Sequence, residues 1–97
     1  MKFEWSERKA VLNLKKHGVS FEEAATVFFD KLAKISFDPD HSNDEHRQIL
    51  IGHSIHKRLL FVVHISHEEK NTMRIISARK ATHRERKDFE SLSRGEK

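Results

Sequence analysis

The stretch LLFVVHI, residues 59–65, is a continuous apolar run with the length and composition of a buried central β-strand. The segments on either side of it, residues 47–52 and 72–79, also have strand patterns. Residues 68–71, which separate the last two segments, are polar or charged and predict a hairpin turn. The middle and end of the chain are therefore expected to form consecutive antiparallel strands.

Two more strands are expected nearer the N-terminus. Ala33, Ile35 and Phe37 alternate with polar residues, which predicts a half-buried strand. Residues 3–5 form a short apolar–polar alternation that predicts an opening edge strand. Residues 38–44 contain the only proline and predict a loop. The expected sheet is an antiparallel meander of four strands plus the short first strand.

Three helices are expected around this sheet. Residues 6–17 begin at a serine that suits an N-cap and end in a basic last turn before Gly18. Residues 20–28 begin with the capping-box pattern S-x-x-E. A second capping box, Thr82 to Glu85, predicts a last helix over residues 82–92.

The helices must cover the apolar side of the sheet. Ala10, Val11 and Leu14 recur at helical spacing and predict the buried stripe of the first helix. Helices on one face of an antiparallel meander give a two-layer α+β domain. Residues 1–92 are expected to form this single domain, and residues 93–97 a frayed C-terminal tail.

Composition excludes several classes of protein. The 97 residues contain no cysteine, which excludes a disulfide scaffold and a thiolate nucleophile. The three glycines form no nucleotide-binding loop. No apolar run resembles a signal peptide or approaches a membrane span, so the protein is expected to be cytoplasmic and to have no membrane partner.

Eight histidines raise the possibility of a metal site. His53 and His56 are three residues apart, as are His64 and His67. Neither pair has a cysteine or an obvious third ligand nearby, which structural and catalytic zinc sites require. Surface or strand-edge histidines are the better interpretation, and we expect neither metal nor other cofactor.

Positive charge is concentrated in the last part of the chain. The net charge of the whole chain is +4, but residues 57–97 hold eleven Lys or Arg against six Asp or Glu. A basic patch attracts polyanions such as nucleic acid. The alternative is an ordinary solvated face.

Residues 74–85, RIISARKATHRE, combine a strand with two arginines and a helix with a basic first turn. Guanidinium groups, lysine and helix N–H groups can each hold a phosphate. RNA cleavage by 2′-OH attack needs little more than such cations and a group that moves protons. The alternative is that Arg74 or Arg79 forms a salt bridge with an acidic residue of the last helix. In a regular strand these two arginines, five apart, would point to opposite faces unless a bulge realigned them.

His17 has two interpretations. In the last turn of a helix it can cap backbone carbonyl groups. Beside Lys15 and Lys16 it could instead act as a general acid or base on an anionic substrate.

With these residues in view, the chain resembles the BrnT toxins, the ribonuclease halves of type II BrnT–BrnA toxin–antitoxin pairs. The resemblance covers about residues 2–90. The following blocks carry it, in order: residues 3–5, Lys9, Asn13, residues 16–24, Glu45, Arg47, residues 51–52, residues 59–63, residues 74–82, Glu85 and Arg86.

The resemblance implies a RelE-like fold, metal-independent RNA cleavage and growth arrest. It also implies neutralisation by BrnA, a ribbon–helix–helix antitoxin, in a complex that binds operator DNA through the antitoxin. The matching polar positions give a candidate catalytic set, with His17 moving protons and arginines stabilising the transition state. That set is His17, Arg47, Arg74 and Arg79. The candidate RNA-binding set is Lys15, Lys16, Lys80, His83 and Arg84.

The chain departs from the family pattern at three places. Ser6 stands where Asp is common, which keeps an N-cap, and Phe89 stands where Tyr is common, which removes a hydroxyl group. A glycine that is usual in the turn over residues 54–58 is missing. A different class of function therefore stays open: a non-catalytic module that binds nucleic acid or an antitoxin, such as an inactive toxin remnant.

Overall fold

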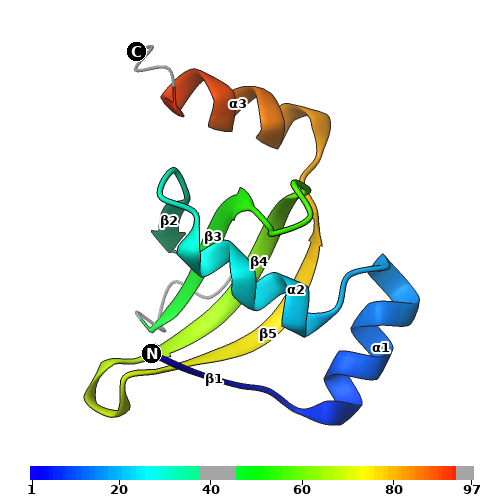
Figure 1. Ribbon diagram of the computed structural model, residues 1–97, viewed down its shortest axis with the longest axis vertical. Helices are drawn as coiled ribbons and strands as arrows, with labels where there is room; N and C mark the ends of the chain where they lie inside the picture. Colours follow the sequence, from blue (N-terminus) through cyan, green and yellow to red (C-terminus); the bar gives the residue numbers. More distant parts are fainter. Residues whose placement is uncertain (38–45, 94–97) are drawn as a thin grey trace.

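The computed structural model describes residues 1–37 and 46–93 and consists of a five-stranded sheet with three α-helices (Figure 1). The strand order is β1-β5-β4-β3-β2, so the apolar run over residues 59–65 lies in the central strand, as predicted. The strands and helices run in chain order as follows: β1 (Lys2–Glu4), α1 (Glu7–His17), α2 (Phe21–Thr26), the 3-10 helix η1 (Val27–Phe29), β2 (Lys34–Phe37), β3 (Arg47–His53), β4 (Leu59–His67), the 3-10 helix η3 (Glu68–Lys70), β5 (Thr72–Lys80) and α3 (His83–Ser93).

The α+β class and the antiparallel meander are confirmed, because β2, β3, β4 and β5 pair in sequence order with antiparallel registers. The opening strand β1 is an edge strand, as predicted, but it pairs with β5 in parallel. The sheet is therefore mixed. The predicted loop over residues 38–44 lies outside the described residues, as do the last four residues of the predicted tail.

Local sequence signals explain where the first two helices begin and end. The Ser6 side chain accepts a hydrogen bond from the Lys9 N–H, and Ser20 does the same for Glu23. Gly18 ends α1 with a positive φ of 69°, a conformation that costs glycine little, and its N–H bonds to the Leu14 carbonyl.

The core lies between one face of the sheet and the layer formed by α1, α2 and η1. Even-numbered residues of β4, such as Leu60 and Val62, point into this core together with Phe21. Gly52 belongs to the same face, and a β-carbon there would lie 2.8 Å from that of Ala33. Only a glycine lets the chain after η1 approach β3 this closely.

Burial of α1 differs from the prediction. Val11 and Leu14 are 53% and 52% exposed, whereas Asn13 is buried. The Asn13 side chain donates to the carbonyl oxygens of Val19 and Ala78, at 2.9 and 2.8 Å, and accepts from the Ala78 N–H. The hydrogen-bonded side-chain amide of Asn13 thus joins α1 to β5, whereas the helical spacing of apolar residues had indicated an apolar contact.

The predicted strand β2 is also more exposed than expected. Ile35 and Phe37 are 60% and 66% exposed, so the strand is not half-buried. β2 is the last strand of the sheet and pairs only with β3. The alternation was correctly interpreted as a strand, but within residues 1–37 and 46–93 no helix covers the outer part of this edge.

α3 departs from the single helical layer that the sequence predicted. It lies across one end of the sheet (Figure 1), and the buried Phe89 ring is 5.5 Å from the His53 ring. His53 pairs with Leu59, and both belong to the odd-numbered positions that face away from the core. α3 therefore covers the end of the face opposite to α1 and α2.

Candidate nucleic-acid interface

Two of the predicted arginines lie in one row across the sheet. Arg47 in β3 and Arg74 in β5 are both paired with Ile65 in β4. Residues directly opposite each other in neighbouring strands point to the same face, so the two guanidinium groups flank Ile65. This face is the one opposite to α1 and α2.

A β-bulge brings Arg79 to the same face. The register of β4 and β5 shifts between Val63 and His64, and Ile76 is the residue of β5 that the pairing skips. Because of this extra residue, Arg79, opposite Phe61, points to the same side as Arg74, opposite Ile65. A bulge was the condition for the two arginines to share a face, and the structure contains it. Arg47, Arg74 and Arg79 are called the arginine face below.

Arg79 is firmly held in place. Its two terminal nitrogens donate to the two carboxylate oxygens of Glu85, at 2.8 and 3.0 Å. Its guanidinium carbon also lies 3.9 Å from the centre of the Phe61 ring. The predicted alternative, a salt bridge to the last helix, is therefore confirmed for Arg79. About a third of its side chain stays exposed, so a ligand can still reach it.

Glu85 has two roles at once. It accepts a hydrogen bond from the Thr82 N–H at 2.8 Å, and the Thr82 hydroxyl accepts one from the Glu85 N–H at 3.1 Å. This is the capping box that the sequence predicted. Hydrogen bonds from Arg79 lower the pKa of the Glu85 carboxyl, despite its partial burial. The first turn of α3 and Arg79 are thus coupled through one ionised carboxylate.

Arg74 is held more loosely. Its nearest acidic partner is Glu4 in the neighbouring strand β1, with the closest nitrogen and oxygen 4.0 Å apart and both side chains exposed. An exposed pair at this distance contributes little to stability. A phosphate group can therefore replace Glu4 at low cost.

The other predicted residues fall into two groups. Lys80, His83 and Arg84 are exposed at the end of β5 and the start of α3, close in the chain to Arg79. Lys15, Lys16 and His17 form the last turn of α1 instead.

Asn13 of α1 bonds both the N–H and the carbonyl oxygen of Ala78, which are backbone groups at the edge of β5 beyond its pairing with β1. The last turn of α1 leads to Gly18, whose carbonyl oxygen accepts a hydrogen bond from Arg58 in the turn before β4. The fold therefore brings the three arginines to one face, while His17 comes from the helix at the β5 edge.

Sequence patterns did not reveal the roles of Phe61 and Glu4. Phe61 was interpreted only as part of a buried strand. Its ring contacts the Arg79 guanidinium because the two residues are paired across β4 and β5. Glu4 meets Arg74 through a parallel pairing between the two ends of the chain, which no local pattern reveals.

The described residues contain neither a metal-binding cluster nor a membrane-spanning helix. No three histidine, aspartate or glutamate side chains there are arranged to hold a metal ion. No helix within residues 1–37 and 46–93 has the length and apolar composition to cross a membrane.

Comparison with known proteins identifies the family. The family model of the ribonuclease toxin BrnT of type II toxin–antitoxin systems matches residues 5–85. The crystal structure of the Brucella abortus ribonuclease toxin BrnT has the same fold, with a TM-score of 0.66 and 24% sequence identity over 86% of this chain and 99% of that one. Among proteins of curated function, none matches the chain significantly. Because the family model spans most of the sequence, the chain belongs to the BrnT family of type II ribonuclease toxins.

Proposed function

We propose that the chain is a metal-independent endoribonuclease whose arginine face binds the RNA backbone at the point of cleavage. The observation that carries this proposal is the β-bulge, which gathers Arg47, Arg74 and Arg79 on one face. Family membership supports RNA as the substrate class and an antitoxin as the partner.

The arginines suit the charge that develops during 2′-OH attack on phosphorus. The O2′–P bond forms and the P–O5′ bond breaks, leaving a 2′,3′-cyclic phosphate and a 5′-hydroxyl. Negative charge builds on the phosphoryl oxygens in between, and fixed cations stabilise it. Arg47 and Arg74 would supply that charge, while Arg79, with His83, Arg84 and the start of α3, would hold the neighbouring phosphate. Lys80 pairs with Leu60 and points to the opposite face from Arg79, so it would meet the RNA only at the end of the strand.

A proton must leave the 2′-OH, and another must reach O5′. His17 is the sequence-based candidate for this transfer, and it lies in the last turn of α1, next to Gly18, whose carbonyl oxygen accepts a hydrogen bond from Arg58. Lys15 and Lys16 lie with it and would at most guide the RNA toward the protein. Comparing His17→Ala with His83→Ala in the cleavage assay assigns the role: the imidazole that transfers the proton is the one whose loss abolishes the pH dependence of the rate.

The direct test of activity is cleavage of a single-stranded RNA by the purified protein, with and without EDTA. Cleavage that persists in EDTA, disappears with 2′-O-methyl RNA and falls about 10²–10³-fold in Arg79→Ala would support the proposal. Loss of cleavage in EDTA would contradict metal independence. Tight RNA binding without cleavage would favour the alternative, a non-catalytic binding module.

The biological role follows from the same activity. We expect expression of the chain alone to arrest growth by cutting cytoplasmic RNA, and co-expression of a BrnA-type ribbon–helix–helix antitoxin to restore it. The heteromeric complex would then bind operator DNA through the antitoxin. Unimpaired growth with a protein that cleaves RNA in vitro would contradict the toxin role.

A further inference from the structure

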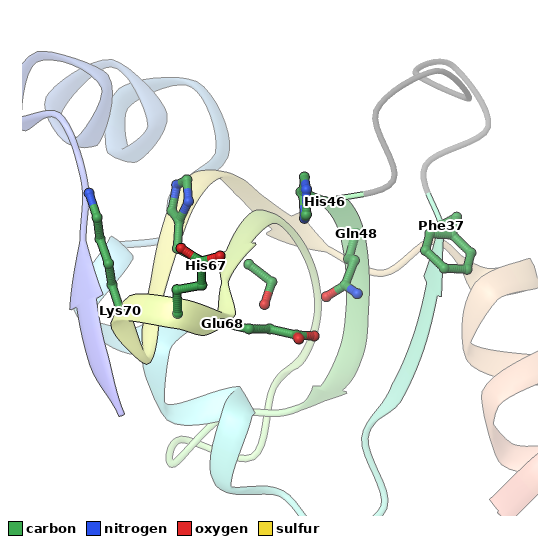
Figure 2. A pocket seen from close by; sticks show the side chains of 8 residues that line it. Phe37, His46, Gln48, His67, Glu68 and Lys70 are labelled. Atoms are coloured by element: carbon green, nitrogen blue, oxygen red, sulfur yellow. The ribbon is translucent and has the colours of Figure 1, made fainter.

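A pocket of about 610 Å³ opens on the core-side face of the sheet, beyond the end of its helical layer (Figure 2). Phe28 of η1 packs its ring 4.8 Å from the His64 ring, and Ser66 is the next residue of β4 on that face. The pocket begins there and extends to the exposed edge strand β2. Its lining consists of Phe37, His46, Gln48, Ser66, His67, Glu68, Glu69 and Lys70.

The floor of the pocket presents polar groups in fixed positions. Gln48 is hydrogen-bonded through Oε1 to Nε2 of the fully buried His64, at 3.1 Å, so its amide cannot rotate freely. The other end of this amide, and the hydroxyl of Ser66, have no hydrogen-bond partner within the described part of the chain. Both groups are therefore available to a ligand.

The charges around the pocket select against a phosphate group. Among the described residues of the lining, Glu68 and Glu69 contribute two carboxylates and Lys70 contributes one ammonium group. Figure 2 shows Gln48 and Glu68 pointing toward one another into the pocket, with Phe37 at one side and Lys70 at the other. The preferred ligand is a flat, uncharged ring that donates hydrogen bonds to a carboxylate and stacks on an aromatic side chain.

We propose that this pocket binds a guanine base of the RNA and sets the position of cleavage, an inference that rests on the proposed ribonuclease function. Among the four RNA bases, guanine alone has two adjacent donor groups on one edge, N1–H and N2–H₂, which match the two oxygens of the Glu68 carboxylate. Its O6 acceptor suits the amide of Gln48, and Phe37 offers the ring for stacking. Unpaired bases in RNA are commonly recognised by such combinations of stacking and edge contacts.

The pocket lies at the same end of the sheet as Arg47 and Arg74 of the arginine face. Arg47 lies between His46 and Gln48 in the chain, and consecutive residues of a strand point to opposite faces. An RNA strand that passes around this end can place a phosphate near Arg47 while a nearby base enters the pocket. Such an arrangement fixes the distance, in nucleotides, between the guanine and the cut.

The first test maps the cut sites of the wild type on an RNA that contains every dinucleotide. We expect guanine to be enriched at one fixed position relative to the cut. Glu68→Gln and Phe37→Ala should reduce this enrichment roughly five- to hundredfold, the range of a bidentate base contact. Glu22→Gln and Phe29→Ala are matched controls, because both residues are exposed and lie outside the pocket. An unchanged cut-site profile in both pocket variants would overturn the proposal.

The second test does not depend on cleavage and so separates the pocket from the ribonuclease proposal. Guanosine monophosphate is titrated into the labelled protein, and the side-chain amide signals of Gln48 are followed by NMR. We expect shifts with guanosine monophosphate that are at least tenfold weaker with the adenosine and uridine nucleotides and are lost in Glu68→Gln. Equal responses to all three nucleotides, or none, would overturn the base site even in an inactive protein. The proposal would also be overturned if the pocket variants lost affinity for the antitoxin and nothing else, because the pocket would then be a contact site for a protein.

Discussion

Among single residues, His64 shows how burial changes the chemistry of a side chain. It is completely buried, its ring packs against Phe28, and its Nδ1 has no hydrogen-bond partner among the described residues. Burial lowers the pKa of His64 to about 4, and the backbone of Val62 opposes this only in part. The imidazole is therefore neutral in the folded protein at physiological pH.

This shift predicts a loss of stability in mild acid. When the pH falls below 6.5, the ordinary pKa of histidine, His64 becomes protonated in the unfolded chain. In the folded protein it stays neutral until the pH approaches about 4. The free energy of unfolding should therefore be unaffected above pH 6.5 and fall by about 3 kcal/mol between pH 6.5 and 4. Urea unfolding measures it across this range. His64→Leu should lose this part of the pH dependence, whereas the exposed-site control His67→Gln should retain it. Parallel curves for wild type and His64→Leu would contradict the prediction.

A buried ion pair is the second residue-scale feature. The Glu23 carboxylate accepts hydrogen bonds from Ser54 and from two nitrogens of Arg58, and the bonds from Arg58 lower its pKa. Removing the Glu23 carboxylate leaves the buried Ser54 hydroxyl without its acceptor and Arg58, whose side chain is 32% exposed, without its ion-pair partner. Glu23→Ala should therefore lower the free energy of unfolding by about 1–3 kcal/mol, while its exposed neighbour, changed as Glu22→Ala, should alter it by less than about 0.5 kcal/mol. Chemical denaturation compares the two, and equal effects would argue against the ion pair.

At the level of elements, local signals located most of the fold. The two N-caps, Gly18 and the capping box at Thr82 correctly placed the starts of the three helices and the end of α1, and strands β3 to β5 lie where the patterns indicated. The second helix was predicted to reach residue 28, but α2 ends at Thr26 and the chain continues as the 3-10 helix η1. Three features could not be located from local sequence patterns, because they depend on contacts between residues that are distant in sequence. These are the parallel pairing of β1, the bulge at Ile76, which no glycine marks, and the burial of Asn13 in place of the apolar stripe.

The same holds for the candidate site. Residues 74–85 predicted that arginines and the start of a helix would lie close together. They did not predict which arginines share a face of the sheet. Cross-strand register decides that question. The base pocket had no sequence signal, because its residues come from β2, β3 and the end of the β4–β5 hairpin.

α3 is an element whose attachment can be tested. Glu85 both caps the helix and holds Arg79, and Phe89 is the buried apolar contact at the sheet. Glu85→Ala should lower the free energy of unfolding by about 1–2 kcal/mol, because a cap and a half-buried pair are lost together. Glu90→Ala, an exposed change in the same helix, is the control. If both variants unfold at the same urea concentration as the wild type, the coupling of Arg79 to the helix cap through Glu85 does not contribute to stability.

At the scale of the whole molecule, the sheet divides the surface into two sides. One carries α1, α2 and the base pocket, and the other carries the arginine face with α3 at its end. Binding of RNA to three arginines should release counterions, so log K for 2′-O-methyl RNA should fall with log salt at a slope of roughly −2. In Arg74→Ala the slope should become shallower by about 0.7. Fluorescence titration at several salt concentrations measures both, and an affinity independent of salt would contradict a phosphate interface.

The central claim is that RNA lies against the arginine face. Methyl NMR spectra recorded during titration with a non-cleavable 2′-O-methyl RNA test it most directly. Val63 and Ile65 belong to that face, whereas Val11 and Leu14 are exposed on α1 and lie outside that face. We predict that the methyl signals of Val63 and Ile65 shift while those of Val11 and Leu14 stay unchanged. Shifts confined to Val11 and Leu14 would contradict the account.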